Sequence, residues 1–470
     1  MEQFEFGIVG LGVMGRNLLL NMADQGIAVV GLDLDPLKAT VLASEVSPQH
    51  HVKGVSAVID FVTALKKPRA ILLLVPAGKP VDVAIAGLLP SLEEGDIIID
   101  GGNTYFTDTD RRALELARQK IHFFGMGISG GEKGARYGPS MMPGGDKVAY
   151  ERLRPLFEAI AAKVNGEPCV AYMGSGSAGH YVKMVHNGIE YGIMQLIAEA
   201  YDLMKRGLGL PDDTIQQAFE TWNGQELQSF LVEITADILK KQDAETGQLL
   251  VNVIADRARS KGTGKWTSQN AMDLQVPVPV IDTAVIMRDL SKQKEQRVAA
   301  ADHYPVEKEI ATAGGIAATL EQLKNALYVA VITTYAQGLA QLQVASQVYG
   351  YGIDLEQVAR IWRGGCIIRS QSLEMFRMAY NRNPRLANLL LDEEVAALVR
   401  SKQNDLRLVV KLAIDRSVPA AAFMAALSYF DAFRSAQLPT NLVQAQRDYF
   451  GAHQYERTDR EGVFHTQWEG

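Results

Sequence analysis

The sequence has few cysteines, no net positive charge and no long apolar runs, and each of these absences excludes a class of protein. The two cysteines among 470 residues, Cys169 and Cys366, cannot form a disulfide framework. The formal net charge of -7 leaves no positive field for nucleic acid. Spanning a bilayer takes about 18 consecutive apolar residues, and neither such a run nor a signal peptide is present. We therefore expect a cytoplasmic protein that binds neither nucleic acid nor membranes.

Metal-binding patterns are missing as well, whereas apolar content is ample. The eight histidines are scattered apart from the adjacent His50 and His51, and no cluster has metal-ligand spacing, so we expect no metal. A chain of 470 residues exceeds what one hydrophobic core usually supports. Two or three domains are expected.

The first third of the chain begins with a dinucleotide-binding pattern. Residues 4–9 and 27–32 have the apolar character of buried strands, and between them lies Gly10-Leu11-Gly12-Val13-Met14-Gly15, a G-x-G-x-x-G turn that opens a helix near Met14. The glycines let the backbone approach a pyrophosphate, whose charge the helix N-terminus stabilises. This pattern predicts an α/β Rossmann-type domain; the alternative is a merely structural glycine turn.

An acidic residue after the second strand indicates which nicotinamide cofactor binds. Asp33 follows Gly15 at the distance where a carboxylate accepts hydrogen bonds from the adenosine ribose and repels a 2′-phosphate. Leu34 offers no donor, Asp35 adds negative charge, and Lys38 is the nearby cation. We predict NAD in preference to NADP, although either Asp could simply cap the next turn.

Further strands are expected at 70–75 and 96–100 and before Ser129-Gly130-Gly131. Ligands of open α/β sheets bind at the carboxyl ends of strands. Asn103 and Ser129 are therefore candidate contacts of the nicotinamide or the substrate, although both belong to common turn-forming sequences. Val75, Pro76 and Ala77 are further candidate cofactor contacts.

Beyond Gly174-Ser175-Gly176-Ser177 the sequence becomes mostly helical, which places a domain boundary near residue 177. Long helices are expected at about 178–206 and 317–348. Trp222-Asn223-Gly224 recurs as Trp362-Arg363-Gly364, each after a long and a shorter helix, which indicates an internal duplication or a chance match. We predict three parts: the α/β domain over 1–177, an all-α domain over 178–435, and a polar C-terminal tail over 436–470.

One helix face carries reactive residues where an ordinary helix is apolar. Lys183, His186, Asn187, Glu190 and Tyr191 are spaced three and four apart and line one face. An amine and a carboxylate on one face can act as paired base and acid. Because a lysine must be neutral to accept a proton, we predict that burial or nearby positive charge lowers the pKa of Lys183. The alternative is a solvated helix face.

A second polar segment, 261–267, looks like a P-loop but lacks its first glycine, because Arg257 stands there. We therefore exclude nucleoside triphosphate binding and expect a glycine-rich turn that suits one phosphate monoester. Arg288 and Arg447 could complete that pocket, since guanidinium groups bind phosphate bidentately.

Together these motifs resemble the decarboxylating 6-phosphogluconate dehydrogenases. The matching segments, in family order, are the glycine turn, Asp100-Gly101-Gly102-Asn103, Gly127-Ile128-Ser129-Gly130-Gly131-Glu132, Gly138-Pro139-Ser140, 182–191, 261–267, 362–370 and 446–453. The resemblance implies oxidation of the carbon-3 hydroxyl of 6-phosphogluconate and loss of carbon dioxide, giving ribulose 5-phosphate. It also implies that Lys183 is the base and that Glu190 protonates the enediol.

Binding residues follow from the same resemblance. Those that would hold the sugar acid are Asn103, Ser129, Gly130, Gly131, His186 and Asn187, and those that would hold the phosphate are Tyr191, Lys261, Thr263 and Arg288. Arg447 and His453 correspond to residues that a tail inserts into the neighbouring subunit's site, which implies a homodimer. The protonated lysine would make a divalent metal unnecessary.

The chain also departs from the family pattern. Asp33-Leu34-Asp35 stands where NADP-using members typically carry Asn-Arg-Thr, so the arginine that grips the 2′-phosphate is missing. Pro76, Lys133 and Ile193 replace a common lysine, glutamate and aspartate. Two other functions stay open: a shorter β-hydroxyacid dehydrogenase of the 3-hydroxyisobutyrate type, which lacks the phosphate-binding segments, and a regulatory protein that binds NAD without turnover.

Overall fold

The computed structural model describes residues 3–45, 47, 49–305 and 315–468. Its N-terminal part is built on a seven-stranded sheet of order β3-β2-β1-β4-β5-β6-β7, in which only the β6–β7 pair is antiparallel. The strands are β1 Phe6–Val9, β2 Val29–Leu32, β3 Val52–Val55, β4 Ala70–Leu73, β5 Ile97–Asp100, β6 His122–Ser129 and β7 Ser140–Gly145. The predicted dinucleotide-binding fold is confirmed.

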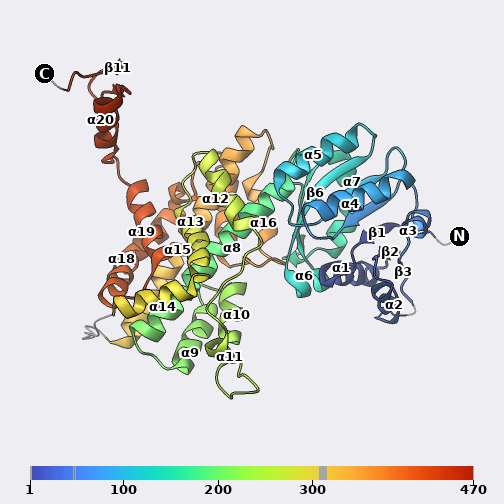
Figure 1. Cartoon of the computed structure of the whole chain (residues 1–470), viewed down its shortest axis with the longest axis horizontal. Helices are drawn as coiled ribbons and strands as arrows, with labels where there is room; N and C mark the ends of the chain where they lie inside the picture. The colour runs from blue at the N-terminus through green and yellow to red at the C-terminus, as the bar shows by residue number, and fades with distance from the viewer. Residues whose placement is uncertain (1–2, 46, 48, 306–314, 469–470) are drawn as a thin grey trace.

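Helices cover both faces of this sheet (Figure 1). They are α1 Val13–Asp24, α2 Pro36–Glu45, α3 Val58–Ala64, α4 Lys79–Leu88, α5 Phe106–Ala117, α6 Gly131–Tyr137 and α7 Lys147–Ile160. Successive strand residues point to opposite faces, so Ile97 and Ile99 join one buried cluster with α1 and α7, while Ile98 joins the other with α3 and α4. Covering both faces explains why the central strands β1, β2 and β4 are apolar and buried along their whole length.

The second part is helical and centres on α8, Ala178–Asp202, which packs against β6, β7 and several helices. The other helices are α9 Asp212–Asn223, α10 Phe230–Ile238, α11 Leu250–Val253, α12 Thr263–Asp273, α13 Pro279–Ser291, α14 Lys294–His303, α15 Ile316–Val348, α16 Leu355–Trp362, α17 Ser372–Arg382, α18 Glu393–Asp415 and α19 Ala421–Phe433. One large apolar core holds most of them together, although α14 contributes no residue to it. The predicted all-α class of this part is confirmed.

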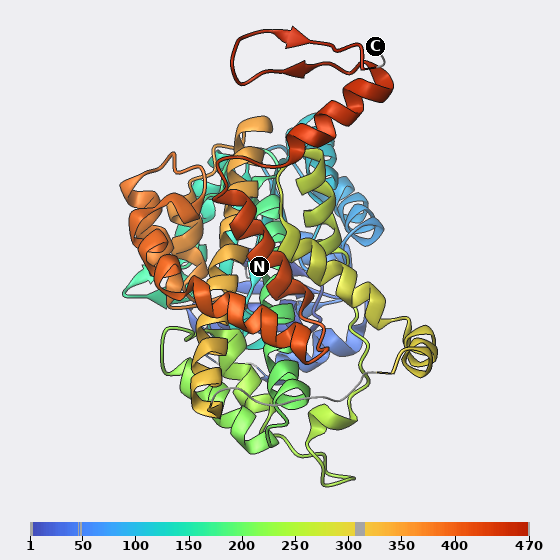
Figure 2. The same cartoon turned by 90° about the vertical axis from the view of Figure 1, so that its left-hand side faces the viewer.

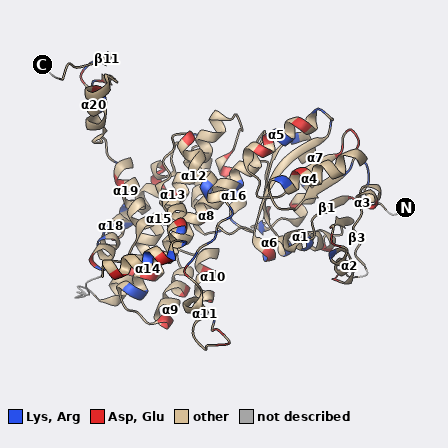
Figure 3. Ribbon diagram, viewed as in Figure 1, with Lys and Arg blue, Asp and Glu red and all other residues tan. Residues whose placement is uncertain are grey.

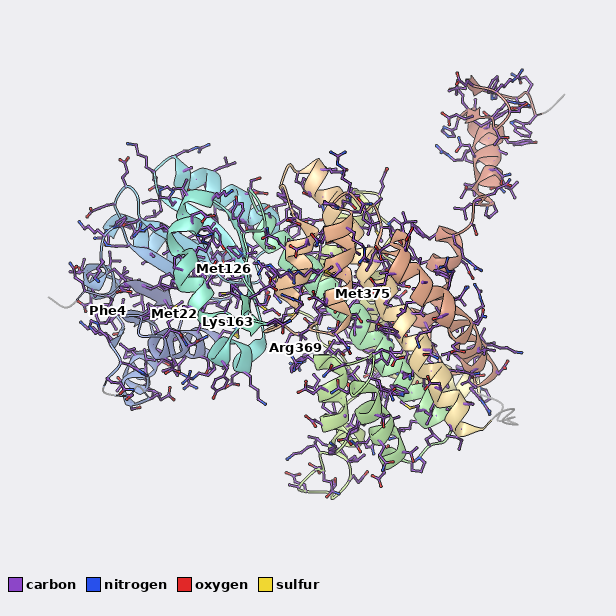
Figure 4. All side chains as sticks on the ribbon, turned by 180° about the vertical axis from the view of Figure 1, so that it is seen from behind. Phe4, Met22, Met126, Lys163, Arg369 and Met375 are labelled. Carbon is purple, nitrogen blue, oxygen red and sulfur yellow. The ribbon has the colours of Figure 1, made fainter. Side chains whose placement is uncertain are left out.

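The two parts meet along α8 and along a short hairpin of β8 Lys163–Val164 and β9 Glu167–Pro168. Arg363, after α16, pairs with Glu167 of this hairpin. Lys163 and Arg369 lie near this junction in Figure 4, and charges of both signs are interspersed over both parts in Figure 3. The two parts are therefore joined by polar contacts as well as by the buried helix.

The C-terminal segment projects away from the helical body (Figures 1 and 2). It consists of α20, Thr440–Gly451, and a hairpin of β10 Tyr455–Glu456 and β11 Val463–Phe464. Residues 469 and 470, the end of the predicted tail, lie outside the described residues. The prediction of a polar tail over 436–470 did not include this local order.

Some sequence expectations differ from the structure in detail. The strand expected over 27–32 begins at Val29, and the helix expected to reach 206 continues after Asp202 as the π-helical turn Leu203–Gly207. The long and short helices α8 and α9 and α15 and α16 occur in the order on which the duplication was based. The duplication and the boundaries at residues 177 and 435 stay predictions.

Candidate active site

Helix α8 comes unusually close to the sheet, and glycine is what allows it. A Cβ atom added to Gly127 of β6 would lie 2.3 Å from Cβ of Lys183, and one added to Gly179 would lie 2.4 Å from the carbonyl oxygen of Met142. No side chain fits at either contact. The close approach brings Lys183 next to the carboxyl end of β6, where ligands of such sheets bind.

The polar face of α8 is buried and hydrogen-bonded within itself. Lys183 Nζ donates to Asn187 Oδ1 at 2.8 Å and lies 3.3 Å from His186 Nδ1. His186 Nδ1 lies 3.1 Å from the same Asn187 oxygen, and its Nε2 lies 3.2 Å from Ser129 Oγ. With the proton on Nδ1, His186 donates to Asn187 and accepts from Ser129. The chain of contacts thereby fixes the lysine amine in one place.

Burial shifts the ionisation of this face toward neutral forms. Desolvation lowers the pKa of Lys183, opposed by the carboxylate of Glu190. Desolvation, reinforced by Lys183, holds the pKa of His186 well below its ordinary value, so the imidazole is neutral. Desolvation also raises the pKa of Glu190, whose Oε2 lies 3.9 Å from His186 Nδ1. The predicted lowering of the pKa of Lys183 therefore agrees with its burial, and the solvated-face alternative is wrong.

Ser129 connects this face to the helical part. Its Oγ accepts a hydrogen bond from the backbone N–H of Ile367 at 3.4 Å, and Ser140 N–H donates to the carbonyl of Gly365 at 2.8 Å. Trp362 lies edge-on to His186, with ring centroids 5.5 Å apart. Residues 362–367 thus form one wall beside the polar face of α8. Gly130 and Gly131 follow Ser129 at the start of α6.

At the far end of the polar face, Tyr191 lies between two elements. The Arg288 guanidinium of α13 stacks on its ring, 3.4 Å from the centroid. On the α12 side, a Cβ at Gly264 would lie 2.5 Å from the same ring. Tyr191, Arg288 and the first turn of α12, which begins at Thr263, therefore lie together, as the sequence predicted for phosphate-binding residues.

The segment 261–267 is a helix N-terminus and not the glycine-rich turn that was expected. Gly262 takes a left-handed conformation, φ 101°, and α12 begins at the next residue. The Thr267 hydroxyl donates inside the protein to the carbonyls of Met184 and Thr263, both at 2.9 Å. Backbone N–H groups of the first turn offer donors for an anion instead. Lys261 is exposed just before this turn.

The glycine turn after β1 fits a dinucleotide. A Cβ at Gly15 would lie 1.8 Å from the Gly10 carbonyl oxygen, whereas one at Gly12 would meet nothing within 4 Å. The turn is therefore tightly closed, with open space over Gly12 at the N-terminus of α1, whose first N–H groups have no partner in the helix. Val75 borders Gly10, and Pro76 and Ala77 are exposed next to it.

Asp33 is held beside this turn as a carboxylate. Its Oδ2 accepts from Leu11 N–H at 2.8 Å, its Oδ1 accepts from Asp35 N–H at 3.0 Å, and Lys38 Nζ lies 3.3 Å from both oxygens. Desolvation opposes ionisation, but these hydrogen bonds outweigh it and lower the pKa of Asp33. Leu34 is exposed beside it. A negative charge therefore stands next to the glycine turn.

Comparison with known proteins identifies the family. Models of the NAD-binding domain and of the C-terminal domain of 6-phosphogluconate dehydrogenase match residues 5–174 and 179–468. The chain is 50% identical over 468 residues to the NADP(+)-dependent, decarboxylating 6-phosphogluconate dehydrogenase of Bacillus subtilis, with 100% of each chain covered. It is 49% identical over 469 residues to the decarboxylating enzyme of Escherichia coli, also with 100% of each covered.

A solved structure gives the same result. The fold matches that of 6-phosphogluconate dehydrogenase of Plasmodium falciparum, described in its apo form and with NADP+ or 6-phosphogluconate, at a TM-score of 0.96 and 43% identity, covering 99% of this chain and 100% of the other. The chain belongs to the decarboxylating 6-phosphogluconate dehydrogenases. It is therefore an oxidoreductase with a nicotinamide-dinucleotide-binding domain, and the β-hydroxyacid and regulatory alternatives are not favoured.

Two of the predicted site residues lie far from the polar face of α8 in the same chain. Arg447 is exposed on α20, where it donates to Gln444, and His453 is exposed just after that helix. Both lie on the projecting tail (Figure 2). The structure brings together the residues of α8, β6, α12 and α13, but it leaves Arg447 and His453 apart from them. Asn103 is exposed after β5, where Asp100 accepts from Gly102 N–H and the Thr104 hydroxyl.

Sequence reasoning missed the wall formed by residues 362–367. The segment 362–370 was among those that resemble the family, and the recurrence of Trp-x-Gly singled out Trp362, but neither observation gave Trp362 a contact in the site. Its contact with His186 depends on packing between distant segments, which spacing does not report. Among the described residues no group of three or more His, Cys, Asp or Glu is arranged to hold a metal ion. No helix within those residues is long and apolar enough to cross a membrane.

Proposed function

We propose that Lys183 and Glu190 perform the proton transfers by which this enzyme oxidises and decarboxylates 6-phosphogluconate to ribulose 5-phosphate. The observation that carries the proposal is the buried Lys183 amine, fixed by Asn187 and His186 beside the carboxyl end of β6. Its lowered pKa favours the neutral amine that a general base needs. Glu190, one turn beyond His186, has a raised pKa and favours the protonated form that a general acid needs.

The two groups act in sequence. Neutral Lys183 accepts the proton of the carbon-3 hydroxyl. A nicotinamide dinucleotide, which the glycine turn after β1 would hold, would supply the oxidation by accepting the hydride of the same carbon. The lysine, now protonated, donates a hydrogen bond to the new ketone and draws electrons toward it. As the bond to the carboxylate breaks and carbon dioxide leaves, Lys183 passes its proton to the former ketone oxygen, and an enediol remains. Glu190 then protonates carbon 1 of this enediol, while the neutral Lys183 takes the proton of the hydroxyl on the second carbon, which becomes the product ketone. The proton on Lys183 returns to the Glu190 carboxylate, so both groups regain their starting forms.

The charged lysine does what a divalent cation would do for the developing enolate, so we propose that the reaction needs no metal. The neutral His186 cannot repel the lysine once it is protonated, because burial keeps the imidazole uncharged. His186 and Asn187 therefore support both states of the amine. Activity that survives thorough chelation supports this part, and activity restored only by a divalent metal contradicts it.

The sugar-acid end and the phosphate end of the substrate are proposed to lie at opposite ends of the polar face. The groups for the sugar acid are Asn103, Ser129, Gly130, Gly131, His186 and Asn187. Those for the phosphate are Tyr191, Lys261, Thr263 and Arg288. Thr263 begins helix α12, and the Arg288 guanidinium stacks on the ring of Tyr191. Both anionic ends then face donors, and carbon 3 lies near Lys183.

We infer that a second copy of the chain completes the site with Arg447 and His453. Their tail projects from the body and exposes large apolar side chains, Leu442, Val443, Phe450 and Trp468 among them. Such exposure on a projecting helix favours burial against another subunit. A homodimer in which each tail reaches the other site is the simplest closed arrangement.

The two free, buried thiols, Cys169 and Cys366, suit a reducing cytoplasm.

We also propose that NAD is preferred to NADP. Asp33 is ionised beside the glycine turn and would repel a 2′-phosphate while accepting a hydrogen bond from a free ribose hydroxyl. The single nearby cation, Lys38, is already engaged by Asp33. The name of the Bacillus subtilis relative states NADP dependence, so the preference rests on the residues of this chain.

The experiment is the initial rate with 6-phosphogluconate and either cofactor, side by side in a chelator, with reduced cofactor and carbon dioxide followed together. Equal release of both products with a higher kcat/KM for NAD supports the whole proposal. Equal release with a higher kcat/KM for NADP keeps the reaction but contradicts the role given to Asp33. Reduced cofactor without carbon dioxide contradicts the decarboxylation.

A further inference from the structure

The tail keeps a defined shape although it projects from the body, so its own contacts must hold it. Asp448 is fully buried, whereas its neighbours on α20 are mostly exposed. A buried carboxylate on a projecting helix is costly unless donors surround it. The contacts of Asp448 therefore show what organises the tail.

Four donors from the rest of the tail converge on this one carboxylate. Oδ1 accepts from Gln454 N–H and lies next to His465 Nδ1, both at 2.9 Å. Oδ2 accepts from Thr466 N–H at 3.1 Å and from Trp468 Nε1–H at 2.8 Å. Desolvation pushes the pKa of Asp448 upward, but these donors outweigh it and hold the pKa well below its usual range. The charged Asp448 carboxylate therefore joins α20 to the turn after it and to the segment after β11. Asp448 and these four donors together are called the hub.

This hub lies between the two tail residues that the proposed function uses. Arg447 directly precedes Asp448, and Gln454, which Asp448 holds, directly follows His453. Ala452 and Gln454, on either side of His453, both have positive φ, 49° and 65°. Non-glycine residues adopt that conformation only when their surroundings enforce it. The direction of the chain at His453 thus depends on the hydrogen bond from Gln454 to Asp448.

The His453 ring itself is folded back on the helix end. A Cβ at Gly451 would lie 2.7 Å from His453 Nε2, and the ring lies 5.9 Å from that of Phe450, edge to face. The ring is therefore placed by the same turn that Asp448 closes. Loss of the hub would let Arg447 and His453 move independently of each other.

We propose that Asp448 is a positioning residue for catalysis in the neighbouring subunit. It holds Arg447 and His453 in the arrangement in which the tail presents them to the substrate phosphate of the second copy. This inference rests on the proposed role of the tail. A tail ordered before binding loses less conformational freedom when it engages the substrate, so the hub acts on substrate affinity more than on the chemical step.

The test is Asp448→Asn, which keeps the size of the side chain but turns an NH2 group toward donors. We expect KM for 6-phosphogluconate to rise about tenfold, with kcat within about twofold and KM for the cofactor unchanged. Asp459→Asn is the matched control, because Asp459 is an exposed acid of the same tail that pairs with Arg457. It should leave all three constants unchanged. A general loss of folding would instead lower the active fraction and kcat without this split.

Arg447→Ala, measured in parallel, distinguishes the role of the tail in substrate binding from the positioning role of Asp448. If both Arg447→Ala and Asp448→Asn raise KM for 6-phosphogluconate, the positioning role is supported. If Arg447→Ala raises it and folded, dimeric Asp448→Asn does not, the positioning role is wrong and the role of the tail stands. If neither raises it, the tail does not serve the site, and both proposals fall.

A milder variant covers the case in which Asp448→Asn does not assemble. Trp468→Phe removes one of the four donors and keeps an aromatic ring near Tyr449, whose ring centroid lies 6.1 Å from that of Trp468. We expect a smaller rise of KM for 6-phosphogluconate, about two- to threefold, with kcat unchanged. An unchanged KM in this variant would overturn the positioning role.

Discussion

Helices α8 and α20 carry the same kinds of polar residue in opposite surroundings. On α8, Lys183 and His186 are buried and bonded to each other and to Asn187. On α20, Arg447 is exposed, and the network around Asp448 fixes the shape of the tail that carries it. Burial tunes the ionisation of α8 toward proton transfer, whereas exposure leaves the Arg447 guanidinium accessible to a ligand. The difference separates chemistry, which one chain can assemble alone, from phosphate binding, which we infer needs two.

Among the variants that remove a difference between α8 and α20, Lys183→Met should have the largest effect. The variant keeps the length of the side chain and removes the amine, so the hydroxyl proton has no acceptor. We expect kcat to fall about 10³- to 10⁴-fold, near the upper range for loss of a general acid–base group, with cofactor affinity unchanged. Stopped-flow measurement of reduced cofactor checks it. A loss under tenfold would exclude Lys183 as the base.

Lys324→Met is the matched control, because Lys324 is also buried but lies 2.8 Å from Glu321 and 3.6 Å from Glu226. Breaking a buried pair leaves charge uncompensated and costs about 3–5 kcal/mol at most, less here because both acids are partly exposed. We expect a lower free energy of unfolding with kcat per folded enzyme unchanged. Lys324, which pairs with acids, would then serve stability alone, whereas Lys183, which contacts an amide and an imidazole, would serve catalysis.

Glu190→Gln should have the next largest effect, a fall in kcat of about 100-fold, because the amide cannot protonate the enediol. It also tests pH dependence. Neutral Lys183 is lost as pH falls through its lowered pKa, and protonated Glu190 is lost as pH rises through its raised pKa. The wild-type profile of kcat is therefore bell-shaped, with two apparent pKa values that belong to the pair. The variant should keep one ionisation; two unchanged limbs would contradict the assignment.

Gly127→Ala tests the close approach that places α8. The new methyl group would lie 2.3 Å from Cβ of Lys183, so the helix or the strand must shift. Overpacking of this kind costs about 1–3 kcal/mol of unfolding free energy, and kcat should fall as the amine moves. Gly87→Ala in α4, where a Cβ meets nothing within 4 Å, should instead be neutral or stabilising by up to about 1 kcal/mol. Equal denaturation midpoints for both variants would contradict the packing argument.

The smallest expected effect concerns the cofactor. Asp33→Asn combined with Leu34→Arg removes the repelling carboxylate and adds a guanidinium for a 2′-phosphate. We expect the ratio of kcat/KM for NAD over NADP to fall at least tenfold, a change of about 1.4 kcal/mol, with little change in kcat. Steady-state rates with both cofactors check it. An unchanged ratio would contradict the role of Asp33.

The sequence predicted well what lies within one helix or one turn. The spacing of Lys183, His186 and Asn187 places them on one face whatever surrounds them, and the glycine turn similarly defines its own geometry. Contacts between segments that are distant in the chain could not be predicted from the sequence. Ser129 meets His186 across 57 residues and Ile367 across 238, because β6, α8 and the segment after α16 pack together only in the folded chain.

Local propensity was misleading where tertiary context decides. The glycines at 262 and 264 favour a turn, yet Gly264 lies in α12, since the absence of a side chain lets that helix pack on Tyr191. The tail has little apolar core, which made it look irregular. Its order comes instead from one carboxylate and its donors, a pattern that hydrophobic periodicity does not report.

The most direct test of two chains sharing one site is a mixed dimer. Lys183→Met and Arg447→Ala subunits carrying different affinity tags are co-expressed and purified through both tags, so that every dimer holds one copy of each. The account predicts one working site of two, made of the Arg447→Ala subunit's α8 and the other subunit's intact tail, and hence about half the wild-type kcat/KM for 6-phosphogluconate. A mixed dimer no more active than the Arg447→Ala homodimer would contradict it.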